Sequence, residues 1–193
     1  MASVVGICNI ALSHIGKPTI TDLDEASEEA RQCKLQYELT RDTMLQVYPW
    51  EFAKTMIVLA EITNTWQQRW QYAYQRPSDC LKARRIVLDI DNPDDTATVP
   101  MGVSEGAIYC GVSPATLEYT RKIIDPNKFP PLFQDALSWS IAAKVAMPLT
   151  GDQSVRKDAF QIAGQTMETA KTADANEEAS SYDYPSAFIS SRG

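Results

Sequence analysis

The residues with the clearest capacity for chemistry are carboxylates that stand in groups. Glu25, Glu28 and Glu29 lie close together, and Glu105 and Glu118 flank a stretch of β character. Two carboxylates can hydrolyse a glycosidic bond, one as general acid and the other as base or nucleophile. The first group also fits a helix start, where carboxylates favour the positive end of the helix dipole. Glycan hydrolysis therefore stands as the alternative to a role without catalysis.

Other catalytic and metal-binding patterns are weak. The one histidine, His14, has no evident partner in the sequence for general-base work, so we interpret it as a helix-terminal residue favoured by the dipole. The Gly16-Lys17 pair lacks the second glycine and the Ser or Thr of a phosphate loop. The four cysteines are widely spaced, which indicates reduced, hydrophobic thiols rather than a zinc site. We expect no catalytic residue, no cofactor and no metal.

Aromatic and basic residues are mixed between positions 66 and 76, with Arg69 and Arg76 among them. Such a stretch can stack the bases of a single-stranded nucleic acid, which gives a third possible function. The preferred interpretation is the aromatic face of a small sheet, because alternation would place the rings of Trp70, Tyr72 and Tyr74 on one side.

Composition and charge restrict the classes of protein to which the chain can belong. The chain has 193 residues, 44% hydrophobic and 22% charged, which fits one globular domain, or one domain carrying an insertion. Eighteen basic and 25 acidic residues give a net charge of -7, which argues against tight binding of DNA phosphates. No apolar run approaches the roughly 18 residues of a membrane span, so we expect no membrane partner. The N-terminus lacks the pattern of a secretory signal.

Apolar residues at helical spacing predict four helices near the two ends of the sequence. They cover residues 4–15, 24–48, 132–148 and 151–173, and Pro148 is expected to end the third. The apolar stripe of the last helix is poor in large side chains. We therefore expect this helix to pack closely or to pair with another subunit.

Residues 50–127 have a different texture. Short β-branched and alternating stretches at 55–62, 70–74, 85–90, 107–112 and 116–123 are separated by turn-forming residues. They predict a small antiparallel sheet or barrel. The predicted class is α+β, mainly α: a helical bundle domain built from both chain ends (1–49 and 128–175), an inserted small antiparallel β domain (50–127) and an extended C-terminal tail (176–193).

The expected tail has no helical or strand period, yet it holds side chains that are typical anchors at interfaces. If extended at about 3.3 Å per residue, it would span about 60 Å. We therefore predict a partner-docking segment anchored by Tyr182, Tyr184, Phe188, Ile189 and Arg192.

Several stretches in order carry a family resemblance. They are Asn9-Ile-Ala-Leu-Ser-His-Ile-Gly16, Ile20-Thr-Asp-Leu-Asp-Glu25, Tyr48-Pro-Trp-Glu-Phe-Ala-Lys54, Tyr74-Gln-Arg-Pro77 and Leu149-Thr-Gly-Asp152. Across residues 4–175 the chain resembles the tail tubular protein A family of short-tailed bacteriophages, the head-to-tail adaptors. The ending Phe188-Ile-Ser-Ser-Arg192 is similar to aromatic-to-arginine endings in such proteins.

The resemblance implies a virion structural protein that is not an enzyme and is assembled in the bacterial host cytoplasm. Members of this family form homo-oligomeric rings, typically dodecamers, between the portal protein and the tail nozzle protein. Viral DNA leaves through the lumen of the ring. Some members have been described as glycan-hydrolysing, but no matching motif is identifiable in this sequence. A negative net charge suits a lumen that must not hold DNA. The portal becomes the expected partner of the tail anchors.

Overall fold

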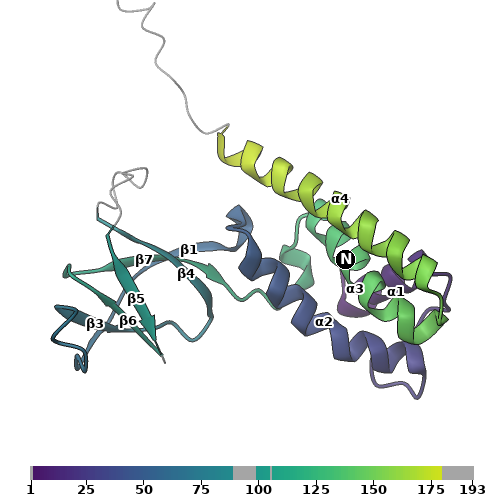
Figure 1. Ribbon diagram of the computed structural model, residues 1–193, viewed down its shortest axis with the longest axis horizontal. Helices are drawn as coiled ribbons and strands as arrows, with labels where there is room; N and C mark the ends of the chain where they lie inside the picture. Colours follow the sequence, from purple (N-terminus) through teal and green to yellow (C-terminus); the bar gives the residue numbers. More distant parts are fainter. Residues whose placement is uncertain (1, 89–98, 105, 180–193) are drawn as a thin grey trace, which may run out of the picture.

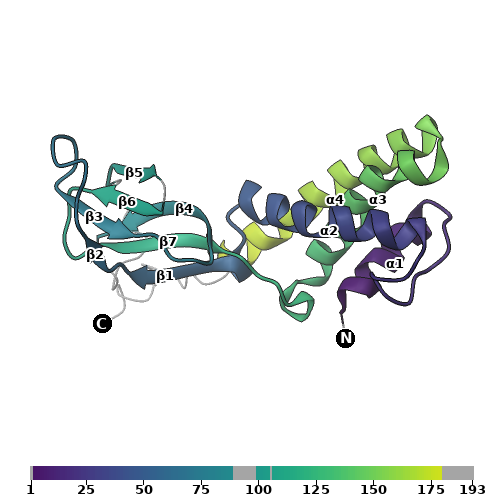
Figure 2. The same ribbon diagram turned by 90° about the horizontal axis from the view of Figure 1, so that it is seen from below.

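The molecule has a helical part and a β part at opposite ends of an elongated shape (Figures 1 and 2). The computed structural model describes residues 2–88, 99–104 and 106–179. Two helices precede the β part in sequence and two follow it. The predicted α+β class, mainly α, is confirmed.

The first two helices begin at serine caps. In α1, Val4–His14, the Ser3 hydroxyl accepts a hydrogen bond from Gly6 N at 2.9 Å. In α2, Glu28–Val47, Ser27 accepts one from Ala30 N at 3.2 Å. The prediction of a helix from residue 24 was wrong by one turn, because Ser27 has extended backbone and its hydroxyl satisfies an N–H of the first helical turn.

Helix α3, Pro131–Thr150, continues past Pro148, which the sequence analysis wrongly expected to end it. The proline stands in the last turn, and the helix stops at Gly151, whose φ of 67° is left-handed. The Gly151 N–H donates to Met147 O at 3.0 Å. Glycine has no Cβ to clash in this conformation, so it makes a better helix terminator than the proline before it.

The last helix, α4, covers Gln153–Ala179 and is longer than predicted. The predicted helix ended at residue 173, and the extended tail was predicted to begin at residue 176. Instead Asp174 is buried in α4, and its Oδ2 accepts a hydrogen bond from Glu51 N at 3.0 Å. The polar run after it contains residues with adequate helix propensity, so a tertiary contact is enough to extend the helix.

One hydrophobic core unites the four helices. Helix α4 lies along α3 (Figure 1), with the small side chains of Ala159, Ala163 and Ala170 buried. The expected close packing of the last helix is confirmed. The largest fully buried apolar side chains of this core are Ile7, Leu12, Leu45, Trp50, Phe133, Leu137 and Ile141.

The β part contains two antiparallel sheets, where the sequence predicted one sheet or a barrel. One has the strand order β1-β7-β4, formed by Lys54–Val58, Thr116–Arg121 and Cys80–Val87. The other has the order β2-β3-β6-β5, formed by Glu61–Ile62, Tyr72–Gln75, Ala107–Cys110 and Met101–Ser104. Tyr74 and Ile108 of the second sheet share a core with Ile86 and Leu117 of the first.

Two strand predictions were wrong. Strand β4 begins at Cys80, five residues before the predicted start, because register shifts between Cys80 and Lys82 and between Ala83 and Arg85 break the alternation that marks a strand. Strand β5 was not predicted, since Met101–Ser104 is short and contains a glycine.

The three rings of residues 70–74 do not share one face, which corrects the sequence analysis. Tyr72 and Tyr74 contact the core between the sheets, whereas Trp70 packs with Ala73 and Tyr109 on the other side. The Trp70 indole lies against Gly102, where a Cβ would come within 3.0 Å of it. Glycine at this position therefore permits the close approach of the ring to strand β5.

The two parts are joined by both crossing segments and by side-chain contacts, most extensively those of one arginine. Trp50 and Phe129, from the two crossings, belong to the helical core. Arg84 on β4 donates to Tyr48 O at 2.8 Å, Gln46 O at 3.1 Å and Thr120 Oγ1 at 2.8 Å. Its guanidinium thus satisfies carbonyls at the C-terminal end of α2, where a positive charge is favoured.

Replacing Arg84 by methionine should loosen this joint. We expect the free energy of unfolding to fall by about 1–3 kcal/mol, the usual range for hydrogen bonds to a charged group. Amide hydrogen exchange should accelerate around residues 46–50. Lys82→Met, at an exposed position of the same strand, is the matched control. Equal exchange rates in the two variants would contradict the assignment of Arg84 to the joint.

Candidate interaction surface on the helical part

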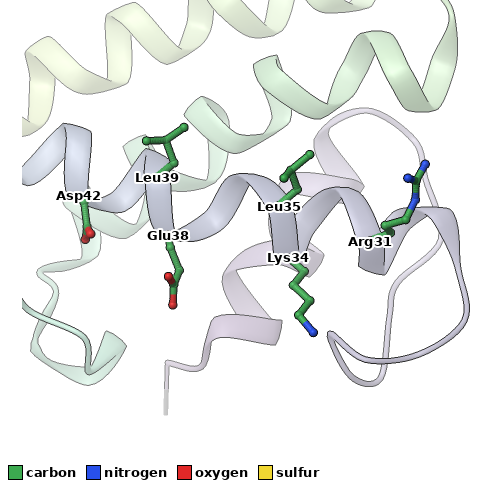
Figure 3. A pocket seen from close by; sticks show the side chains of 6 residues that line it. All are labelled: Arg31, Lys34, Leu35, Glu38, Leu39 and Asp42. Carbon is green, nitrogen blue, oxygen red and sulfur yellow. The ribbon is translucent and has the colours of Figure 1, made fainter.

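The strongest candidate for a functional surface is the exposed apolar face of α2, formed by Leu35, Leu39 and Val47. These side chains are 66%, 63% and 57% exposed. Figure 3 shows Leu35 and Leu39 pointing to the same side of the helix, away from Lys34 and Glu38. Large aliphatic side chains this exposed along one helix are typical of a surface that another chain covers.

Charged side chains border the apolar face. Arg31 pairs with Glu28 at 2.6 Å, and Lys34 forms an ion pair with Asp24. An apolar centre with a polar rim is the usual anatomy of a protein–protein interface. Exposed pairs of this kind add little affinity, so the leucines are expected to supply most of the binding free energy.

A partly buried charge network fixes α2 to the segment that follows β7. Arg41 is 2% exposed and donates to Asp42 Oδ1 at 2.7 Å, while Lys122 reaches Asp42 Oδ2 at 3.0 Å. Burial alone would raise the pKa of the Asp42 carboxyl, but the hydrogen bonds from Arg41 and Lys122 hold it below its usual value. The face of α2 is therefore presented on a firmly held helix.

A groove opens beside this face, between α2, α3 and α4, with a volume of about 490 Å³. Phe160 of α4 and Met147 of α3 stand in it and are 74% and 44% exposed. Lys144 donates to Thr40 Oγ1 at 2.9 Å, and burial lowers the pKa of its ammonium group. We call this the α2–α4 groove.

The carboxylates considered for glycan hydrolysis are engaged in structural contacts. Glu25 accepts hydrogen bonds from Thr21 N at 2.8 Å, Thr21 Oγ1 at 2.9 Å and Ser27 Oγ at 2.7 Å, and these lower its pKa to about 2. The hydrogen bonds from Arg31 likewise lower the pKa of Glu28. A general acid needs a raised pKa, so both groups are poorly suited to that role.

Of the other pair, only Glu118 belongs to the described residues. Glu118 is buried on β7, and its Oε2 accepts hydrogen bonds from Arg85 Nε at 3.0 Å and Nη2 at 2.9 Å. This cross-strand pair joins β7 to β4. Its predicted companion, Glu105, lies outside the described residues. Glu29, the third carboxylate of the first group, lies in the first turn of α2.

Glu25→Gln tests the role of that carboxylate in closing the turn before α2. Because the pKa of Glu25 is lower in the folded protein, the ionised carboxylate stabilises the fold at pH values above the ordinary pKa near 4.5. This stabilisation is lost as the pH falls towards the pKa of about 2 in the folded state. We expect the variant to unfold more easily than wild type at pH 7 and the difference to shrink between these values. Urea unfolding at several pH values measures it, with the exposed Glu38→Gln as control. A difference that does not change with pH would contradict the assignment.

His14 is the last residue of α1, where the sequence placed it, and its ring is also held by stacking. Its ring lies 3.6 Å from that of Trp139 at an interplanar angle of 6°, and Nε2 is 3.0 Å from Ser138 Oγ. Burial lowers the pKa of His14, with the nearby Asp135 acting in the opposite direction. The lowered pKa favours a neutral ring at pH 7, so a charge–dipole contact is not its main anchor.

The aromatic and basic stretch forms a loop on the β part and continues into strand β3. Trp66 stacks on Tyr109 at 5.2 Å, and the Arg69 guanidinium lies 5.6 Å from the centre of the Trp70 ring. Arg76 donates to the carbonyl oxygens of Cys80 and Leu81 at 2.6 and 3.2 Å. One of its two arginines is thus used inside the fold, which favours a structural role over nucleic-acid stacking.

The predicted docking anchors Tyr182, Tyr184, Phe188, Ile189 and Arg192 lie outside the described residues. The four cysteines are buried and unpaired, as expected. Within residues 2–88, 99–104 and 106–179 no group of three or more His, Cys, Asp or Glu side chains could bind a metal ion. Over the same ranges, no helix combines the length and apolar character needed to cross a bilayer.

Sequence reasoning missed the apolar face of α2 and Phe160 of α4. The signal was present, because Leu35 and Leu39 are four residues apart and so share a helix face. It was overlooked because the same helix has a second, buried apolar stripe. In comparisons with known proteins, no family model and no curated sequence matches the chain significantly.

Proposed function

We propose that this protein is a virion structural protein, a head-to-tail adaptor whose copies form a ring between portal and tail nozzle. The observation that carries the proposal is the exposed apolar face of α2, formed by Leu35, Leu39 and Val47 on a firmly held helix. A surface of this kind is expected to be covered by another protein chain. The ordered stretches that resemble the tail tubular protein A family supply the identity of the assembly.

A second copy is the preferred occupant of this face. Identical subunits that meet through two different surfaces close into a ring when the rotation between them is fixed. The elongated shape, with a helical end and a β end (Figure 2), gives each copy two separate ends for two different neighbours along the tail axis. In this proposal the helical part makes the ring and contacts the portal protein, and the β part faces the tail nozzle protein.

The charge of the chain suits a channel through which DNA must slide. The net charge of -7 repels phosphates, and tight contacts would need a basic surface. The proposed ring lines the ejection path without binding the viral DNA tightly. This role needs no catalytic step, no cofactor and no membrane.

The mass of the full chain, alone and mixed with purified portal, tests the proposal. We expect a ring of defined stoichiometry, a dodecamer by the family resemblance, in at least the mixture with portal. A monomer that stays free of portal under both conditions would overturn the proposal. A peptidoglycan-degradation assay on the same sample addresses the alternative, a cell-wall hydrolase; activity lost in Glu25→Gln would favour that function instead.

A further inference from the structure

The α2–α4 groove has a chemistry that the adaptor role alone does not explain. Its walls are partly apolar, and the charged residues that line it, Lys144 and Arg156, are both positive. A cationic groove in a chain of net charge -7 is selective for an acidic and apolar occupant. The lining comes from α2, α3 and α4 and includes Met44, Lys144, Met147, Arg156 and Phe160.

The groove offers well-defined contacts to such an occupant. Phe160 is 74% exposed and can stack on an aromatic ring, and Met147 and Met44 supply adaptable apolar surface. The Lys144 ammonium is partly desolvated and held by the neutral Thr40 hydroxyl at 2.9 Å. A carboxylate arriving at this position would pair with a charge that burial has already stripped of part of its water.

The sequence itself contains a segment of matching chemistry. Residues 182–189 read Tyr-Asp-Tyr-Pro-Ser-Ala-Phe-Ile and combine aromatic anchors with the carboxylate of Asp183. We propose that the α2–α4 groove of one copy binds residues 182–189 of a second copy. This inference rests on the proposed ring, because the ring brings two copies side by side.

Chain length favours the groove of a second copy over the copy's own. Phe160 precedes Ala179, the last residue of α4, by 19 residues, about 28 Å along the helix axis. A segment folding back from Ala179 carries Phe188 about 30 Å at full extension. Tyr182 and Tyr184 then reach no more than about 10 and 17 Å, so they would fall short of Phe160 in their own copy.

Binding between copies also fits the mechanics of a ring. Each contact is modest by itself, but repetition around the ring makes release of one segment reversible without loss of the assembly. The occupant forms a strap from one copy to the next. The groove of the second copy and the portal compete for the same anchors of this segment. The test must therefore distinguish binding to the groove from binding to the portal.

Photo-crosslinking from the groove identifies the occupant directly. Phe160→p-benzoylphenylalanine is a mild change because the side chain is exposed. Copies with and without isotope labels are mixed, and the full chain is irradiated alone at high concentration and with purified portal. We expect cross-links between differently labelled copies, ending within residues 182–189. Cross-links only within one copy, only to portal, to other segments, or none under either condition would overturn the proposal.

Charge exchange tests the same contact energetically. Lys144→Glu and Asp183→Lys should each weaken self-association about tenfold, the effect of losing one favourable pair, and the double variant should recover most of it. Lys157→Glu, an exposed position of α4 outside the groove lining, is the matched control. Single variants that associate like wild type, or a double variant without recovery, would refute the pairing.

A labelled peptide of residues 180–193 separates this inference from the ring itself. The peptide should bind to the wild-type full chain and bind more weakly to the Lys144→Glu variant, whether or not a ring forms. A ring of unchanged mass together with no peptide binding would reject the strap and leave the adaptor function standing. Peptide binding without any ring or portal complex would reject the adaptor function and leave the binding of this segment in the groove standing.

Discussion

Replacing Leu35 and Leu39 together by glutamate is expected to abolish the self-association that we propose and to leave each copy folded. Both side chains are more than half exposed, so their removal from the monomer costs little packing. In an interface each leucine contributes about 1.5–3 kcal/mol by leaving water. Losing two of them, and placing carboxylates where they would be desolvated, weakens the contact by more than about a hundredfold.

The measurement is the mass of the purified double variant, alone and with portal, beside its circular dichroism spectrum and unfolding midpoint. Leu88→Glu is the matched control, since this leucine is 52% exposed but belongs to the β part. We expect the control to assemble like wild type. A double variant that assembles normally would show that another surface joins the copies, and the proposed function would lose its main support.

The helices were predictable because each has a buried stripe at helical spacing. The helix 4–15 was found almost to the residue, since Ser3 and Gly16 mark its ends in sequence as well as in space. The start of α2 was not, because three acidic residues precede the capping serine and imitate a first turn. The end of α4 was not, because its last turns depend on a tertiary contact from Asp174 to Glu51.

The β part and the candidate surface show what a single sequence conceals. Strand β4 carries two register shifts, and these erase the alternation that identifies strands. Trp70 packs outward although its spacing places it with Tyr72 and Tyr74, because the chain is not yet in a strand at that position. Helix α2 has two apolar stripes, and its sequence alone does not show which of them the rest of the protein covers. Only the positions of α1 and α3 determine that.

Replacing Trp50 by alanine will cause the largest loss of stability of any single change we consider. Trp50 is 1% exposed and stands between α2 and β1, where the chain crosses from one part to the other. Its indole meets Phe133 edge-on at 5.0 Å and Tyr48 at 4.9 Å, and its Nε1 donates to Met44 O at 2.8 Å. Removing a buried tryptophan typically costs about 3–5 kcal/mol through lost burial and a residual cavity.

Two further variants separate the causes. Trp50→Phe retains a ring in the aromatic cluster but leaves Met44 O without its partner, so we expect a smaller loss of about 1–3 kcal/mol. Trp66→Ala removes an indole that is 46% exposed and should change the free energy of unfolding least. Urea titrations followed by circular dichroism measure all three. If Trp50→Ala were no worse than Trp66→Ala, the crossing segment would not be part of the helical core. The face of α2 would then lack the rigid support that a ring contact requires.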